Sequence, residues 1–322
     1  MLQKINQRLN QLMPFITPTA VLVGITFSVY LKDFTFLVPW LFAFMTFEGS
    51  LSMNVRSFKS VITHPLPVFL ILTFLHIIMP LWAWLVGHIT FSDNPLTITG
   101  IIIAMIIPTG VTSFIWVSMK NGNKALTLAI ILIDSLLSPI VVPFSLSVLV
   151  GQKVEIDVVS MMTGLLFMIV LPSILGMLLN ELTKGKVNSL WKPRLTPISK
   201  LFLFLVVSLN GSVIAAHFQD FQISYLYIIV IVLFVSITGY LFAFLLGNLL
   251  KYNQEMLVSF TFSGGMRNIS AGAVIAISYF PSTVVFPVVV GMLFQQIIAS
   301  IFALVLDKHN EKVLANSETV SA

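Results

Sequence analysis

The chain has no cysteine and very little charge for its length. Without cysteine it forms no disulfide, no thiolate metal site and no thiol nucleophile. Only 9% of its 322 residues are charged, whereas soluble domains carry about 25% because their surfaces face water. The sequence also lacks His-Glu-x-x-His, Gly-x-Ser-x-Gly and Gly-x-x-x-x-Gly-Lys-Ser/Thr segments. We therefore expect no enzyme, no metal, no cofactor and no ATP-driven step in this chain.

Apolar residues take the place of charge. They make up 57% of the chain, and the mean hydropathy is +1.02. A chain this long and apolar needs lipid as the solvent for most of its surface, which predicts an all-α polytopic membrane protein. No small-residue cleavage site follows the first apolar segment, so we expect that segment to be retained as a helix.

A membrane span needs roughly 20 apolar residues, and the sequence predicts ten spans joined by short connections, with no soluble domain. Their approximate bounds are Pro14–Leu31, Phe34–Met53, Pro65–His88, Leu96–Met119, Leu126–Gly151, Val158–Leu179, Ile198–His217, Ile223–Leu250, Met256–Tyr279 and Thr283–Leu306.

The distribution of Lys and Arg predicts the orientation, because cytoplasmic loops carry an excess of both. With the N-terminus in the cytoplasm, only Lys32 and Lys153 fall in outer loops, and Arg267 falls inside a span. We expect a multi-pass plasma (inner) membrane protein with both termini in the cytoplasm, and the net charge of +5 then reflects topology rather than nucleic-acid binding. The predicted cytoplasmic basic residues are Lys4, Arg8, Arg56, Lys59, Lys120, Lys124, Lys184, Lys186, Lys192, Arg194, Lys200, Lys251, Lys308 and Lys312.

Similar segments recur five spans apart. Glu48-Gly49-Ser50 ends the second span and Asn210-Gly211-Ser212 the seventh, while Gly-rich polar stretches at 108–113 and 263–268 interrupt the fourth and ninth. A single such break is also explained by a kink or close packing. Because five is odd, the halves are inverted, as in many secondary transporters. We predict inverted repeats at 1–153 and 154–306, followed by a polar, frayed cytoplasmic tail at 307–322.

Three charged residues lie within predicted spans, where a charge needs a partner or a cavity. Arg267 keeps its proton, so it pairs with a carboxylate, holds an anionic substrate, or takes the place of a coupling cation. Asp134 is either its permanent partner or a carrier of coupling protons. Glu48 lies near a helix end, where it is either functional or solvated, and His76 is either a packing residue or part of the coupling site.

A series of short segments follows the order and spacing of a known family. They are Phe47-Glu48-Gly49-Ser50-Leu51, Phe58-Lys59, His64-Pro65, Ile78-Met79-Pro80, the break at 108–113, Leu136-Leu137-Ser138-Pro139 and Gly265-Met266-x-Asn268. Together they resemble the bile acid:sodium symporter family from about Pro14 to Leu306. No single segment is specific; their order and spacing are.

The resemblance implies ten helices in two inverted five-helix repeats. A core domain would hold helices three to five and eight to ten, and a panel domain helices one, two, six and seven. Helices four and nine would be discontinuous and cross, with sodium sites beside the crossing. Substrates in the family are mostly organic anions, from bile acids to small carboxylates, and they are carried by alternating access.

This sequence departs from the family at the sodium sites. Of the five positions that correspond to the first site, only Ser113 and Thr127 keep a suitable oxygen, and at the second site Arg267 brings a fixed positive charge that repels sodium. The resemblance therefore does not carry sodium coupling onto this chain. The residues at the first site are Ser113, Phe114, Thr127, Ile131 and Ser263, and those at the second are Ser263, Arg267 and Leu75.

We predict a secondary transporter of a small organic anion with reduced or no sodium dependence, coupled to a proton or to sodium. The alternatives are a sodium symporter with rearranged ligands and a membrane sensor or interaction protein that does not transport. The expected partners are the anion and the lipid bilayer, with no nucleic acid and no obligate protein. The predicted substrate-binding residues are Thr112, Ser113, Arg267, Asn268 and Gln295, and the predicted coupling residues are Asp134, Thr127, Ser263, Glu48 and His76.

Overall fold

The computed structural model describes residues 15–53, 65–151, 154, 156–216 and 222–321, and this part of the chain is helical with no strand. Several residues used in the sequence argument lie outside the described residues, as does residue 153 at the predicted repeat boundary. They are Lys4, Arg8, Arg56, Phe58, Lys59, His64 and Lys153.

The helices follow one another with few connecting residues. The first half contains Phe15–Thr26, α2 (Ser28–Leu31), the 3-10 helix η1 (Lys32–Leu37), α3 (Val38–Ser50), α5 (Pro65–Thr73), the π-helical turn η2 (Phe74–Ile78), α6 (Met79–Thr90), α7 (Pro95–Ile106), α8 (Val111–Met119) and α9 (Lys124–Val150). The second half contains α10 (Val158–Leu165), the π-helical turn η4 (Leu166–Val170), α11 (Leu171–Leu182), α12 (Lys186–Leu190), α13 (Lys192–Val213), α15 (Ile223–Leu249), α16 (Gln254–Gly265), α17 (Ile269–Tyr279) and α18 (Ser282–Ser321).

In the described part of the chain, seven continuous helical stretches are long and apolar enough to cross a bilayer, or eight when α7 and α8 are counted as one span bent by 51°. Three of the seven join neighbouring elements, namely Ser28–Ser50, Pro65–Thr90 and Val158–Leu182. Each predicted span coincides with helical segments, but the helix at Phe15–Thr26 is short and the segment α16–α17 is interrupted. The multi-pass architecture is therefore confirmed, while the count of ten stays a prediction.

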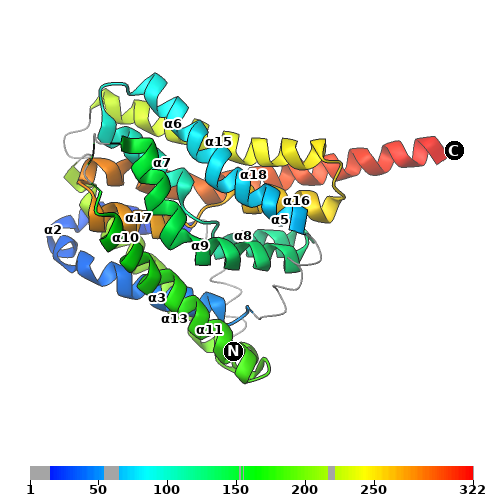
Figure 1. Cartoon of the computed structure of the whole chain (residues 1–322), viewed down its shortest axis with the longest axis horizontal. Coiled ribbons are helices and arrows are strands. Elements are labelled where there is room, and N and C mark those ends of the chain that lie inside the picture. Colours follow the sequence, from blue (N-terminus) through cyan, green and yellow to red (C-terminus); the bar gives the residue numbers. More distant parts are fainter. Residues whose placement is uncertain (1–14, 54–64, 152–153, 155, 217–221, 322) are drawn as a thin grey trace.

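The helices form two groups (Figure 1). Helices α3, α11 and α13 pack together on one side of the molecule, and α6, α15 and α18 lie on the other. A Cβ on Gly176 of α11 would lie 2.7 Å from the carbonyl oxygen of Phe47 of α3, and one on Gly211 of α13 would lie 2.9 Å from that of Val21 in the helix Phe15–Thr26. Small residues at such points let helix backbones approach closely inside a membrane.

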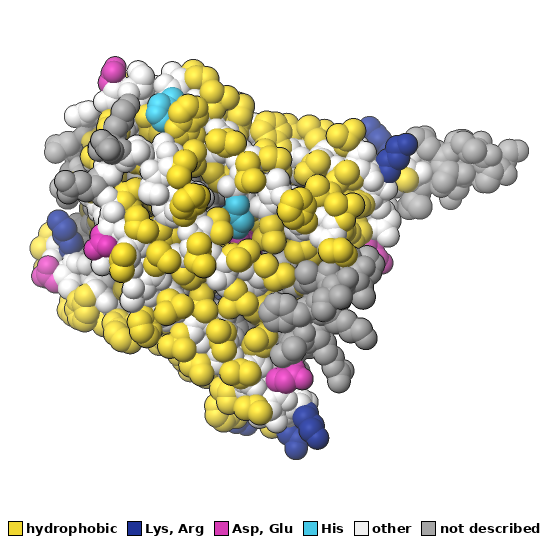
Figure 2. Space-filling view, viewed as in Figure 1, with side chains coloured by type: hydrophobic (Ala, Val, Ile, Leu, Met, Phe, Trp, Pro, Cys, Tyr) yellow, Lys and Arg dark blue, Asp and Glu magenta, His cyan; other side chains and the backbone are white. Residues whose placement is uncertain are grey.

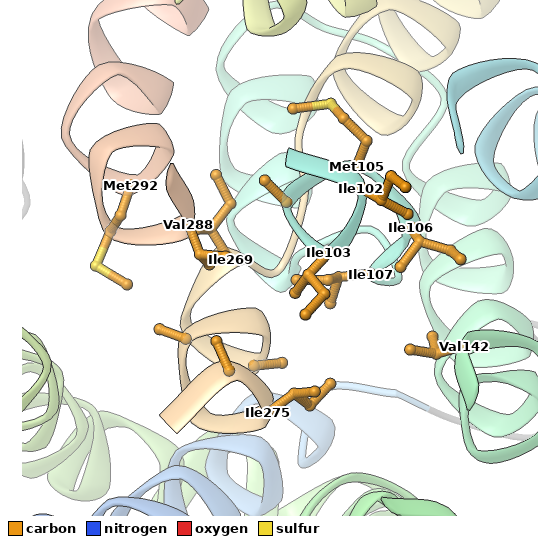
Figure 3. Close-up of a cluster of buried hydrophobic side chains, with 14 of the residues drawn as sticks. Ile102, Ile103, Met105, Ile106, Ile107, Val142, Ile269, Ile275, Val288 and Met292 are labelled. Carbon is orange, nitrogen blue, oxygen red and sulfur yellow. The ribbon is translucent and has the colours of Figure 1, made fainter. Parts of the chain in front are cut away.

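An apolar cluster fills the centre of the molecule around the helix breaks (Figure 3). Ile102 and Ile106 come from α7, Ile269 from α17 and Val288 from α18, and each is buried. Because these side chains exclude water, the polar groups that lie among them must find their partners within the protein.

The outer surface is largely apolar, as one face shows in Figure 2. Large side chains such as Trp40 (75% exposed), Ile89 (73%) and Phe144 (65%) stand in positions that suit lipid rather than water.

The expectation of a frayed tail is wrong, because α18 continues through Ser321. No Gly or Pro follows Gly291 to interrupt the helix, and Asp307 is tied to Lys120 by an ion pair of 2.5 Å.

Candidate functional site

Two helices are interrupted in the interior of the molecule. Helix α7 ends at Ile106, and Ile107 is extended (φ −65°, ψ 146°) because the following Pro108 disfavours helical geometry at the residue before it. Helix α16 ends at Gly265, and Met266 is extended (φ −90°, ψ 140°). After each break a second half-helix begins, α8 at Val111 and α17 at Ile269.

The two breaks are in direct contact. The backbone N–H of Asn268 donates to the carbonyl oxygen of Pro108 at 2.8 Å, and Thr109 Oγ1 donates to the carbonyl oxygen of Met266 at 3.2 Å. A Cβ on Gly110 would lie 3.1 Å from the carbonyl oxygen of Arg267, so glycine permits the close approach. Residues 157 or more positions apart in the chain therefore form one site.

The Arg267 side chain turns from its break toward the C-terminal ends of α7 and α16. Nε donates to the carbonyl oxygen of Met105 at 2.9 Å, and Nη1 donates to those of Gly264 at 2.6 Å and Met266 at 3.2 Å. Carbonyls in the last turn of a helix lack intrahelical partners and form the negative end of the helix dipole. The guanidinium, whose residue is 1% exposed, thus occupies a position that stabilises positive charge.

No carboxylate among the described residues forms an ion pair with Arg267 within 4 Å. Asp134 nevertheless attracts Arg267 electrostatically across the site. The guanidinium Nη2 is buried without a hydrogen-bond partner, while the backbone N–H of Arg267 donates to Gln295 Oε1 at 3.0 Å. Of the sequence alternatives for Arg267, the direct ion pair with Asp134 or Glu48 is therefore absent.

Asp134 of α9 is fully buried and accepts a hydrogen bond from the backbone of the first break. Its Oδ1 lies 2.5 Å from His76 Nε2, and its Oδ2 accepts from the backbone N–H of Thr109 at 2.6 Å. His76 lies in the π-helical turn η2, a type of irregularity that is frequent at functional sites. The structure thus brings together two of the predicted coupling residues that are 58 positions apart.

A cavity of about 130 Å³ lies beside the point where the two breaks, Pro108–Gly110 and Met266–Asn268, meet; this contact is called the crossing below. Four of the predicted substrate-binding residues line it, namely Thr112, Arg267, Asn268 and Gln295, whereas Ser113 is absent from its lining and is fully buried. The remaining lining residues are Thr17, Phe42, Met45, Thr46, Gly110, Val111, Leu203, Ile269, Ser270, Met292 and Gln296.

The N-terminal ends of both second half-helices open onto this cavity. Val111 and Thr112 form the first turn of α8, and Ile269 and Ser270 form the first turn of α17. The first N–H groups of a helix lack intrahelical acceptors, and the helix dipole is positive there, so two such ends favour a negatively charged group.

The other predicted coupling residues lie apart from the cavity lining. Thr127 Oγ1 donates to the carbonyl oxygen of Asn123 in its own helix at 3.0 Å, and Ser263 Oγ is buried without a partner. Glu48 accepts a hydrogen bond from Thr196 Oγ1 of α13 at 2.6 Å, so it belongs to the contact between α3 and α13. In the described part of the chain, no three His, Asp or Glu side chains gather as metal ligands would.

Four polar residues of the cavity lining were not among the predicted site residues, namely Thr17, Thr46, Ser270 and Gln296. Thr17 and Thr46 bring hydroxyls to the cavity from the helix Phe15–Thr26 and from α3, and a single threonine in an apolar span gives no signal of this kind. Gln296 also lines the cavity and accepts from Trp116 Nε1 at 3.0 Å; its signal, the adjacent amides Gln295-Gln296, was present in the sequence.

Comparison with known proteins agrees with this architecture. Residues 39–219 match the sequence profile of the sodium bile acid symporter family. YbaS of Bacillus subtilis (strain 168) is 50% identical over 300 residues, which cover 93% of this chain and 98% of that protein. The chain belongs to the sodium bile acid symporter family.

More distant relatives of this family member are described as transporters. YocS of Bacillus subtilis (strain 168), named as a sodium-dependent transporter, is 22% identical over 92% of both chains. The chloroplastic BASS1 of Arabidopsis thaliana, named as a probable sodium/metabolite cotransporter, is 24% identical over 90% of this chain and 67% of its own length. The chain is therefore a multi-pass membrane transporter and not an enzyme.

Proposed function

We propose that this protein is a secondary active transporter that carries a small organic anion by alternating access. The observation that carries the proposal is the cavity onto which the N-terminal ends of α8 and α17 both open. Such ends bind the anionic groups of substrates in transporters with broken helices. Amides of Asn268 and Gln295 and the hydroxyl of Thr112 supply hydrogen bonds to orient the anion.

The second part of the proposal is that transport depends weakly or not at all on sodium. In transporters with broken helices, coupling cations bind at the C-terminal ends of half-helices and at unwound carbonyls. Here the carbonyls of Met105, Gly264 and Met266 accept hydrogen bonds from Arg267 instead. The guanidinium is covalently part of the chain, so it stabilises these carbonyl oxygens permanently, whereas a coupling cation would do so only while it is bound.

We also propose the finer architecture: ten spans in two inverted repeats, 1–153 and 154–306, divided into a core and a panel domain, with 307–322 as a cytoplasmic tail. Matching local features support it. Asn94 caps α7 by accepting from Thr97 N at 3.1 Å, and Asn253 caps α16 by accepting from Met256 N at 3.0 Å. The first half-helix of each broken pair thus begins in the same way.

The proposed location is the plasma membrane, with both termini in the cytoplasm. The bias of Lys and Arg toward one set of loops supports this orientation. The partners are the transported anion and lipid, without nucleic acid and without an obligate protein partner.

The test is uptake and counterflow of radiolabelled carboxylates, including pyruvate, lactate and taurocholate, in proteoliposomes with either sodium or choline outside. We expect transport of an anion that sodium does not stimulate. An Arg267→Gln variant should lose transport or gain a sodium response, because the cation position is then vacated. Arg194→Gln is the matched control, since Arg194 is exposed at the start of α13. If Arg267→Gln behaves like the control, Arg267 is scaffold and this part of the proposal fails.

A sodium symporter with rearranged ligands is the second candidate. Only Ser113 and Thr127 were expected to keep a suitable oxygen, but the hydroxyl oxygens of Ser113 and Ser263 are both buried without hydrogen-bond partners. Ser263 therefore offers a second hard oxygen atom to a small cation. Strong stimulation by sodium in the same proteoliposomes would favour this candidate over the first.

A further inference from the structure

We propose that His76 and Asp134 form a proton-binding site that couples proton movement to transport of the anion. The inference rests on the proposed function, and it assigns the coupling ion that the proposed function leaves open. It stands on the geometry of a part-buried histidine that is paired with a fully buried carboxylate, which is attached to a helix break.

The pair has one free position for a proton. With Asp134 ionised, Nε2 of neutral His76 carries the hydrogen that points to Oδ1 at 2.5 Å. Nδ1 of the same ring is then an acceptor, and it is buried without a hydrogen-bond partner. A proton that enters from water binds there and converts the pair to an imidazolium–carboxylate ion pair, with no other bond made or broken.

The pair is linked directly to the crossing. Asp134 Oδ2 accepts from the backbone N–H of Thr109, and Thr109 Oγ1 donates to the carbonyl oxygen of Met266 in the other break. Protonation of His76 strengthens its hydrogen bond to the Asp134 carboxylate. This changes the hydrogen bond from Thr109 to Asp134, and Thr109 is in turn bonded to the second break. This gives the proton a route to influence the cavity without contact with the substrate.

Few other charges act on this site. Among the helices that pack against α9, namely α5, α7, α8, α10, η4 and α16, only α16 carries another ionisable side chain, Glu255. Among those that pack against η2, namely α5, α6 and α7, only α6 does, at His88 in its last turn. Glu255 lies in the first turn of α16, at the end opposite the break. Arg267 faces Asp134 across the crossing, and Tyr240 of α15 lies beside Arg267.

The charges of the site predict the stoichiometry. With neutral His76, the positive charge of Arg267 and the negative charge of Asp134 cancel. A bound monovalent anion leaves one negative charge uncompensated in the membrane interior, which is strongly unfavourable. One proton on His76 restores neutrality, so the chain should move one proton with each monoanion in the same direction.

The first test locates the proton and does not need the substrate. In lipid nanodiscs of ¹⁵N-histidine-labelled protein, the His76→Gln variant identifies the His76 resonances. We expect a neutral ring with its hydrogen on Nε2 at high pH and a doubly protonated ring at low pH. His88, whose Nδ1 lies 2.9 Å from the carbonyl oxygen of Trp84 in its own helix, provides the matched control. A His76 ring that carries its hydrogen on Nδ1, or that does not protonate between pH 8 and about 5, would overturn the proposal.

The second test follows proton movement in proteoliposomes loaded with the pH dye pyranine. A transported carboxylate should acidify the lumen, and a gradient of one pH unit should support about tenfold accumulation. His76→Gln should lose the response to the gradient, while His88→Gln keeps both that response and counterflow. Counterflow by the wild type without proton movement would overturn this inference alone. If no carboxylate shows counterflow, the proposed function fails, and the first test still decides whether the proton site exists.

Discussion

The break between α7 and α8 and the break between α16 and α17 are stabilised by charges of opposite sign, because a backbone N–H is satisfied at the first and carbonyl oxygens are satisfied at the second. At the first break, an N–H of Thr109 is satisfied by the carboxylate of Asp134. At the second, the carbonyls of Gly264 and Met266 are satisfied by the guanidinium of Arg267, which also reaches Met105 of α7. The crossing is thus held by a separated pair of charges rather than by an ion pair, and each charge stabilises backbone at the crossing.

The largest expected effect comes from removing one charge without the other. Asp134→Asn and Arg267→Gln should each lower the free energy of unfolding by about 3–5 kcal/mol, because each leaves the opposite charge buried and uncompensated. The double variant should lose clearly less than the sum. Unfolding in mixed detergent micelles measures the three differences. Strictly additive losses would show that the two charges act independently and would contradict the comparison.

A smaller loss of stability is expected when a larger side chain at position 110 pushes the two breaks apart. Gly110→Ala adds a Cβ 3.1 Å from the carbonyl oxygen of Arg267, so the crossing must shift, and we expect about 1–3 kcal/mol of destabilisation with a marked loss of transport. Gly49→Ala is the control, because its Cβ would meet Val111 side-chain atoms at an ordinary 3.5 Å. Equal behaviour of the two variants in uptake and thermal unfolding would show that close contact of the breaks is unimportant.

Capping of the first half-helices should contribute less again. Asn94→Ala and Asn253→Ala each remove a side-chain acceptor at the start of a half-helix, and each should lower the free energy of unfolding by about 1 kcal/mol with little change in transport. Similar losses would agree with the proposed repeat. A loss that is several times larger in one variant than in the other would indicate that the two broken helices are not equivalent.

The smallest effect concerns a charge outside the spans. Hydrogen bonds from the side chain and backbone of Ser160 hold the pKa of Asp157, the N-cap residue of α10, below its ordinary value of 3.8. Its contribution to stability is therefore complete above that value and is lost as the pH falls through the lower pKa of the folded state. Thermal unfolding of Asp157→Asn should lack this acid-side loss. A variant with the same acid dependence as the wild type would assign the loss to other groups.

The class of the protein and the location of the site could be predicted from the sequence, because both depend on local patterns of residue type. Low charge indicated lipid as the solvent, and the residues Pro108 and Gly264-Gly265 indicated where helices end. The partners of Arg267 were not predictable, since a carbonyl acceptor 162 positions away leaves no trace in residue type. The pair of His76 with Asp134 was likewise invisible, because each residue alone fits a packing or structural explanation.

The central claim is that the Arg267 guanidinium occupies the place of a coupling cation between the C-terminal ends of α7 and α16. Equilibrium binding of sodium-22 to purified wild type and Arg267→Gln measures this most directly. The account predicts no saturable binding to the wild type, together with saturable binding or loss of transport in the variant. Saturable sodium binding to the wild-type protein, unchanged in Arg267→Gln, would contradict it.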